Sequence, residues 1–306
     1  MLTGRTVKYV RASSVVSVVP VIVAVLIGAV PVAHAQVPAP TDGSWLSTVN
    51  DFRSDLGLRR VSEDPAQSAA ARKHSIYMVE TGFVEHGEKA DSRWSTPAGR
   101  EAGEQSNVAG GTGPAPTEAQ TVRMWIEAPF HRVGLMRPGW RTSGYALESG
   151  VREGEQRWGA TLNVLAGLTG AGSAKWPVVW PNARRVVEAD YLAFERIEWP
   201  DPAVGCPRSR DFDYGTIVTA SFGPGKDVKV RSAHLRVRGG DPVPLCVESP
   251  LSYKRDDYTD VGWRILQESN TVMVLPRRPL SAGKTYQGRI TLTDGRVARI
   301  LFSTAA

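Results

Sequence analysis

The 306-residue chain is predicted to fold as an α+β protein with two domains, a helix-rich first half followed by an all-β second half. Helix-like segments with caps dominate residues 44–127, and strand-like segments follow at residues 143–165, an order typical of a layered α+β domain. From residue 177 onward, short β-rich runs alternate with proline and glycine turns. Between the two patterns, residues 167–176 are rich in Gly, Ala, Ser and Thr and are predicted to be a linker.

The first 35 residues are predicted to be an export signal. Arg5, Lys8 and Arg11 form a basic start, residues 15–30 are almost wholly apolar, and Ala33-His34-Ala35 is typical of a cleavage site. An uncleaved membrane anchor is the alternative, because the apolar run approaches the length of a bilayer span.

The charge distribution argues against a nucleic-acid partner. The predicted signal carries three basic residues and no acidic residue, so its removal lowers the formal net charge from +6 to +3. We find no run of Lys and Arg with interleaved aromatic residues, which a nucleic-acid interface would need. We therefore expect no nucleic-acid partner, and membrane contact only through an uncleaved signal.

Four helices are predicted in the first half. Asp64 is a favourable N-cap, and Pro65 suits the first position of a helix that ends near Gly82. Thr117 and Gln120 have the spacing of a capping box. The elements expected after a flexible lead-in at residues 36–43 are helices at residues 44–57, 65–82, 96–104 and 117–126 and strands at residues 143–149 and 157–165.

Side chains that bind metals or move protons near pH 7 are concentrated between residues 74 and 144. His74 lies on a helix face, and His86 follows that helix on a short polar loop. His131 comes after a break at Pro129 and is expected at the end of an element. Three histidines from separate segments can thus reach one cleft. The other side chains of interest in this stretch are Glu85, Glu88, Glu104, Ser106 and Glu127.

Residues spread over Leu46–Ala166 match the pattern of a known family. They are Val49-Asn50, Arg53, Gly57-Leu58, Ala70 to Met78, His86-Gly87-Glu88, Ser106 to Ala109, Trp125, Pro129 to Arg132 and Gly144. With them the run resembles the CAP superfamily of secreted proteins (cysteine-rich secretory, antigen 5 and pathogenesis-related proteins) in its cysteine-poor bacterial form. The resemblance implies an α-β-α sandwich at residues 44–166 and a bacterial protein that is secreted or held in the cell envelope.

In that family, two histidines and two acidic residues line a cleft that can hold a divalent cation. The resemblance implies that His86 and His131 are the two histidines. Many relatives have Gly-Glu-Asn where this chain has Gln105-Ser106-Asn107, so Ser106 replaces a glutamate. Glu88 can supply the missing carboxylate. The expected metal ligands for zinc or magnesium are His86, His131 and Glu88, and the expected cleft residues are His74, Glu104, Ser106, Asn107 and Arg132.

Each of these residues has a plainer interpretation. His74 can be a hydrogen-bonded histidine on a helix face, and His86 and His131 can pin loops through backbone carbonyls. Arg132 can be a packing residue. Ser106 lacks the Gly-x-Ser-x-Gly elbow of a serine nucleophile, which favours a structural role for its hydroxyl.

The second half, residues 177–306, is predicted to be a β-sandwich, because about seven short strands are separated by turns. Asp294-Gly295 is a hairpin signal of the type I′ class. Trp199-Pro200-Asp201-Pro202 and the closing residues 280–304 resemble the immunoglobulin-like modules of bacterial exported proteins. The predicted strands span residues 188–198, 216–222, 228–237, 243–247, 271–275, 285–292 and 297–303.

The two cysteines, Cys206 and Cys246, both lie in the second half. Because an exported chain meets an oxidising environment, we expect them to form a disulfide. Two free buried thiols are the alternative. A zinc site would need more ligands than these cysteines and His234 provide.

Two functions remain. The favoured one is an exported, non-catalytic binding protein whose cleft of His86, Glu88 and His131 holds a divalent ion, a small apolar or peptidic ligand, or a cell-wall component. The alternative is a secreted hydrolase, a peptidase or cell-wall enzyme, in which His86 or His131 is the general base for water or Ser106.

Overall fold

The computed structural model describes residues 43–170, 172–189, 199–206, 214–253 and 260–306. The predicted signal and nearly all of the lead-in lie outside these ranges. The described residues belong to one compact unit, and the predicted boundary at residues 167–176 stays a prediction. None of the helices described here is long and apolar enough to cross a membrane.

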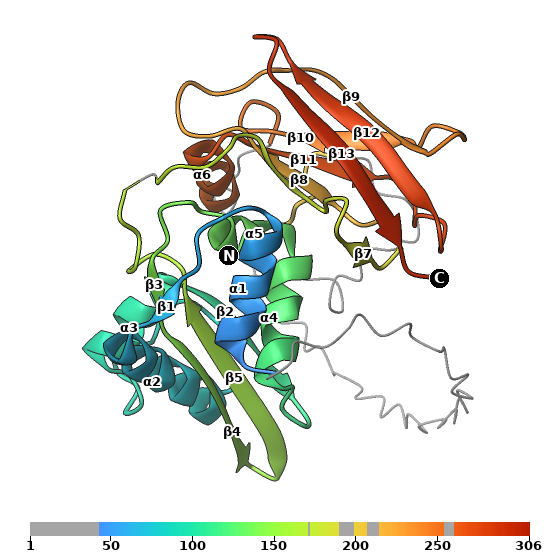
Figure 1. The fold of residues 1–306 in the computed structure, drawn as a ribbon. Helices are drawn as coiled ribbons and strands as arrows, with labels where there is room; N and C mark the ends of the chain where they lie inside the picture. Colours follow the sequence, from blue (N-terminus) through green and yellow to red (C-terminus); the bar gives the residue numbers. More distant parts are fainter. Residues whose placement is uncertain (1–42, 171, 190–198, 207–213, 254–259) are drawn as a thin grey trace, which may run out of the picture. The chain divides into compact units, whose positions relative to one another are not determined.

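The first half is built on a three-stranded antiparallel sheet with the strand order β2-β5-β4. Helices cover both of its faces, with α2 and α3 on one side and α1 and α4 on the other (Figure 1). The α+β class predicted for this half is confirmed. Its elements are α1 (Trp45–Asp55), β1 (Ser62–Glu63), α2 (Pro65–Thr81), α3 (Pro97–Glu104), β2 (Ser106–Thr112), α4 (Glu118–Glu127), α5 (Pro129–Leu135), β3 (Thr142–Ser143), β4 (Tyr145–Arg152) and β5 (Glu155–Asn163).

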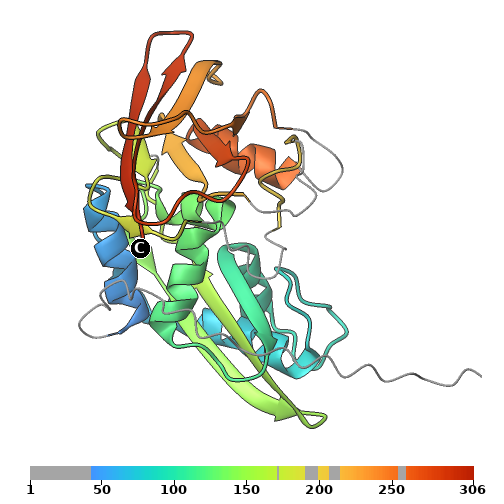
Figure 2. The ribbon, with the colours of Figure 1, turned by 90° about the vertical axis from the view of Figure 1, so that its right-hand side faces the viewer.

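Successive side chains of the central strand β5 point to opposite faces of the sheet, so they contact different helical layers. The Thr161 hydroxyl accepts a 2.9 Å hydrogen bond from Ser75 of α2. Ala160 and Leu162 are fully buried and belong to the apolar cluster that also contains Trp125 of α4. The β4–β5 hairpin extends past the helices in two perpendicular views (Figures 1 and 2).

The second half contains two four-stranded sheets and one helix among its described residues. The strand orders are β10-β11-β8-β6 and β7-β13-β12-β9. The region is thus β-rich, which agrees with a sandwich, but nothing identifies it as immunoglobulin-like. Its elements are β6 (Val178–Trp180), β7 (Val186–Val187), β8 (Val218–Ser221), β9 (Val230–Val237), β10 (Leu245–Glu248), α6 (Asp260–Glu268), β11 (Thr271–Pro276), β12 (Thr285–Leu292) and β13 (Val297–Thr304).

Two features of the second half differ from the prediction, and a third predicted element is left untested. Helix α6 is present where no element was expected. The predicted strand at residues 188–198 lies almost entirely outside the described residues. The hairpin at Asp294-Gly295 forms, but the predicted type I′ turn is wrong. That turn needs a positive φ at both residues, and only Gly295 has one, at 90°. Gly295 N–H donates to the Leu292 carbonyl, which is typical of a three-residue loop ending in a left-handed glycine.

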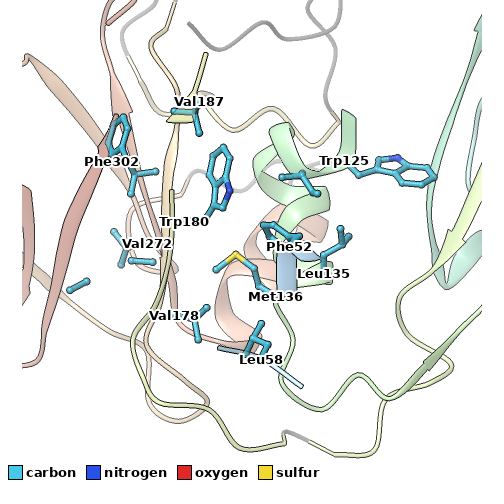
Figure 3. Close-up of a cluster of buried hydrophobic side chains, with 14 of the residues drawn as sticks. Phe52, Leu58, Trp125, Leu135, Met136, Val178, Trp180, Val187, Val272 and Phe302 are labelled. Carbon is cyan, nitrogen blue, oxygen red and sulfur yellow. The ribbon is translucent and has the colours of Figure 1, made fainter. Parts of the chain in front are cut away.

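Both halves contribute to one buried apolar cluster. Figure 3 shows Val178 and Trp180 of β6 facing Phe52 and Met136 of the first half. Met136 also lies within 3.6 Å of the Thr219 hydroxyl, which donates to its sulfur. The two halves are therefore packed through shared side chains.

Candidate functional site

His86 is held by a hydrogen bond that fixes its tautomer. Its Nδ1 lies 2.9 Å from the carbonyl oxygen of Gly103, at the end of α3. A carbonyl can only accept, so Nδ1 carries the proton and Nε2 of the neutral ring keeps its lone pair. Burial lowers the pKa of His86; the hydrogen bond to Gly103 opposes this shift, while nearby His131 and His74 add to it.

The close approach of α3 to His86 requires glycine at position 103. A Cβ there would lie 2.3 Å from the His86 carbonyl oxygen and 2.4 Å from Cε1 of His74. Real side chains do not tolerate such distances, so a larger residue would push α3 away. Gly103 therefore positions the ring of His86.

His131 lies inside a helix, and the expectation that it sits at the end of an element is wrong. Pro129 occupies the first turn of α5, where proline is tolerated, so it starts a new helix that includes His131. The Asn107 side chain donates a 3.1 Å hydrogen bond from Nδ2 to the His131 carbonyl. This bond ties the start of β2 to α5.

His86 and His131 border the same pocket, which has a volume of about 470 Å³. Three further residues that were predicted for the cleft, Glu104, Ser106 and Asn107, also line it. The pocket is open to solvent at Glu104, which is exposed. The structure thus brings five of the predicted site residues to one hollow.

Glu88 does not join them, which corrects its predicted place among the metal ligands. Its side chain is fully buried, with Oε1 3.1 Å from Nδ1 of His74. Its other oxygen accepts a 2.8 Å hydrogen bond from the backbone N–H of Thr96, the N-cap of α3. The carboxylate therefore fixes the start of α3 and faces away from the pocket.

His74 and Arg132 were predicted for the cleft and do not line it. His74 is fully buried, and its Nε2 lies 2.9 Å from the Glu85 carbonyl oxygen. Arg132 is also fully buried; its guanidinium donates to the Ile126 and Ile217 carbonyls at 2.7 and 2.8 Å. The plainer interpretation of both residues, a structural role, agrees with these contacts.

The sequence prediction missed the side of the pocket formed by the second half. The residues of α6 that line it are spaced one helical turn apart, at positions i, i+3, i+4 and i+7. This spacing was the available signal, but it could not show what the helix faces. Further lining residues that were not predicted are Phe130, Arg137, Leu165, Trp199, Val261, Arg264, Ile265 and Glu268.

The donor set at the pocket does not form a three-ligand metal site. Within the described part of the chain, one group of three His, Cys, Asp or Glu residues has ligand atoms close enough for a shared ion, and it is Cys206, Cys246 and Glu248. The two cysteines form the predicted disulfide, so their sulfurs are not thiolate ligands. His86 and His131 belong to no such group among the residues that the structure describes.

A protein-family model matches most of the first half of the chain. Residues 46–158 match the model of the family described as CAP, the cysteine-rich secretory protein family. The search of curated proteins gave no match.

Three solved structures are similar at low identity. An outer surface protein from Borrelia burgdorferi is 15% identical, with a TM-score of 0.28, and the match covers 39% of this chain and 87% of that chain. The protein MpPR-1i is 12% identical, with a TM-score of 0.30, and coverage is 43% and 93%. An extracellular protein containing an SCP domain from Bacillus anthracis str. Ames is 15% identical, with a TM-score of 0.27, and coverage is 39% and 38%. On the strength of the family model, residues 46–158 of this chain are a CAP domain.

Proposed function

We propose that the protein is an exported, non-catalytic binding protein whose pocket beside His86 and His131 takes a small, partly apolar or peptidic ligand. The observation that carries the proposal is the pocket itself. Its volume of about 470 Å³ suits a small organic molecule. Apolar side chains from both halves line it, among them Phe130, Leu165 and Ile265. Such surfaces gain free energy when a ligand removes them from water.

The predicted export signal and the CAP domain support a secreted or cell-envelope location in a bacterium. In that setting the ligand would be a small molecule, a peptide or a piece of cell wall. The second half then takes part in binding, because its residues form part of the pocket wall.

A divalent ion is a second candidate occupant of the histidine side. The free Nε2 of His86 and the nearby His131 would offer two imidazoles, which suit zinc better than magnesium because magnesium prefers oxygen ligands. Glu88 is turned away, so water would have to complete the coordination. We therefore expect weak zinc binding and no tight magnesium site.

A neutral fluorescent dye, N-phenyl-1-naphthylamine, tests the proposed pocket. We expect its emission to rise on addition of the wild-type protein. Val261→Glu places a charge on the pocket wall and should weaken dye binding about fivefold or more. Leu301→Glu is the matched control, because Leu301 is exposed on β13 away from the pocket and its replacement should leave binding unchanged. Equal binding by Val261→Glu and the wild type would refute the assignment.

Zinc binding is tested separately by thermal unfolding. An ion that binds the folded state raises the melting temperature. We expect a small rise in the wild type and a smaller one in His131→Ala. The control is His234→Ala, which removes an exposed histidine of β9 and should retain the wild-type response. If zinc shifts none of the three proteins, the histidine pair has no metal role.

The hydrolase alternative has less support from the geometry. Among the described residues, the Ser106 hydroxyl has no hydrogen-bond partner, so neither histidine is placed to take its proton in this arrangement. Water activated by a histidine is the remaining catalytic route. Incubation with peptide and cell-wall substrates tests it, and products that disappear in His86→Ala would favour the enzyme.

A further inference from the structure

We propose that the ligand of this pocket carries a single anionic group, a carboxylate on an apolar body, and that α6 and Arg137 recognise it. This inference rests on the proposed binding function and specifies the chemical class of the ligand. It arises from two unpartnered polar groups at the pocket and from the face that α6 turns toward it.

The first observation is a pair of buried polar atoms that lack partners. Among the described residues, Oγ of Ser106 and Nε of Arg137 have no hydrogen-bond partner, and both side chains line the pocket. Ser106 is 5% exposed, and the Arg137 side chain is 11% exposed. A buried polar group without a partner is costly. Both atoms are covered by neighbouring side chains, so a ligand with acceptor oxygens would satisfy the N–H and the O–H after a local side-chain shift.

The charge of Arg137 is already partly neutralised. Its guanidinium forms an ion pair with Glu268 of α6 through Nη2, and its buried Nε donor stays unused. The ion pair joins the end of α5 to α6 and holds the two sides of the pocket together. A ligand oxygen at Nε would therefore add to an existing pair without displacing it.

The second observation is Arg264, a cation at the pocket without a carboxylate partner in the described structure. Its Nε donates to the carbonyl of Asp260 in its own helix, at 3.3 Å. Arg264 is exposed, and it lies between the pocket-lining residues Val261 and Ile265 on one helix face. An anion here would be recognised next to apolar surface, where a charge-assisted hydrogen bond is strong.

The acidic residues at the pocket limit the charge of the ligand. Glu104 and Glu268 also border it, and both are exposed. Two carboxylates near the binding site would repel a dianion such as a phosphate monoester more than a monoanion. The apolar side chains Phe130, Leu165 and Ile265 would contact the body of the ligand. An apolar monocarboxylate fits these features together.

Isothermal titration with octanoate and 1-octanol tests the anionic group. We expect the wild type to bind octanoate about tenfold more tightly than octanol, because only the carboxylate can pair with arginine. Arg264→Ala should remove most of this difference by weakening octanoate binding and leaving octanol binding unchanged. Arg299→Ala is the matched control, since Arg299 is exposed on β13 away from the pocket.

A peptide pair distinguishes the source of the carboxylate. N-acetyl-Leu-Leu with a free C-terminus is compared with its C-terminal amide. Tighter binding of the acid form of the peptide than of octanoate indicates a peptide end, and the reverse order indicates a fatty acid. In either case, the preference for the carboxylate over the amide or the alcohol must depend on Arg264.

Three results would overturn the inference. Equal affinity for octanoate and octanol, an Arg264→Ala variant that keeps the preference, or no binding of any carboxylate would each do so. The proposed binding function would still stand after any of these results if N-phenyl-1-naphthylamine binds the wild type and Val261→Glu weakens that binding.

Discussion

The guanidinium carbon of Arg132 lies 3.7 Å from the ring centroid of Trp180, so a residue of the CAP domain stacks on a tryptophan of the second half. The same guanidinium donates to the Ile126 carbonyl within the CAP domain and to the Ile217 carbonyl beside β8. A fully buried cation thus finds its partners in two parts of the chain that are far apart in sequence. The stacking and the hydrogen bonds together connect α5 to β6 and β8.

Arg132→Ala is expected to destabilise the protein by about 3–5 kcal/mol, because it leaves buried carbonyls without donors and a cavity beside Trp180. Arg132→Lys should cost less, about 2 kcal/mol, since lysine keeps the charge but cannot form the planar fork. Urea unfolding of the two variants measures both values. The control Arg299→Ala alters an exposed arginine and should stay within about 0.5 kcal/mol of the wild type. A loss below about 1 kcal/mol for Arg132→Ala would contradict the described contacts.

The buried carboxylate of Glu88 should be essential for the fold of the α2–α3 region. Glu88→Ala leaves Nδ1 of His74 and the N–H of Thr96 without their acceptor, and we expect a loss of about 2–4 kcal/mol in urea unfolding. Glu101→Ala, at an exposed position of α3, is the matched control. If Glu88 were instead a metal ligand at the pocket, its removal would reduce the thermal response to zinc with little effect on stability.

Glu127 should make stability fall as pH rises. Burial raises its pKa to about 7, and Glu188 adds to this while Arg132 and Arg185 oppose it. A carboxyl whose pKa is higher in the folded than in the unfolded state stabilises the fold fully at pH values below its unfolded pKa. This stabilisation is lost as the pH rises through the folded pKa of about 7. The free energy of unfolding of Glu127→Gln should therefore exceed that of the wild type by about 1–2 kcal/mol at pH 8 and by little at pH 5.

Urea unfolding across that pH range gives the difference. Glu153→Gln, at an exposed turn, serves as the control and should follow the wild type at every pH. A difference between Glu127→Gln and the wild type that does not change with pH would refute the raised pKa.

The disulfide should contribute substantially to stability, because Cys206 and Cys246 are 40 residues apart. In the chain-entropy model, closing a loop of this length stabilises by about 4 kcal/mol at most. We expect the double variant Cys206→Ser and Cys246→Ser to lose up to this amount in urea unfolding. A reducing agent should destabilise the wild type to a similar degree and leave the double variant unchanged. An equal response of both proteins to the reductant would show that the bond is not formed.

Local signals in the sequence predicted the helices of the first half well. As expected, Asp64 caps α2 and the helix ends at Gly82, which adopts the left-handed conformation. The capping box of Thr117 and Gln120 is present at α4. These features succeed because a cap is decided by residues three or four positions apart. Strand β2 was missed for the opposite reason, since its Gly- and Ala-rich sequence becomes a strand only by pairing with β5.

The site was predictable only where the resemblance supplied positions. His86 and His131 reach one pocket, as the family pattern implied. Glu88 was placed wrongly because it is near His86 in sequence, whereas its side chain turns inward to His74. The contribution of α6 could not be predicted, because nothing local in residues 260–268 shows that they lie across from the histidines.

The wall that α6 adds to the pocket divides the site between two regions that can change independently. The histidines belong to the CAP domain at residues 46–158, whereas Arg264 and Ile265 lie outside it. Replacing these two residues alters the shape and charge of the hollow without disturbing the sheet and helices that hold His86 and His131. Under the proposed function, new ligand selectivity can thus evolve on a retained scaffold through substitutions in one short helix.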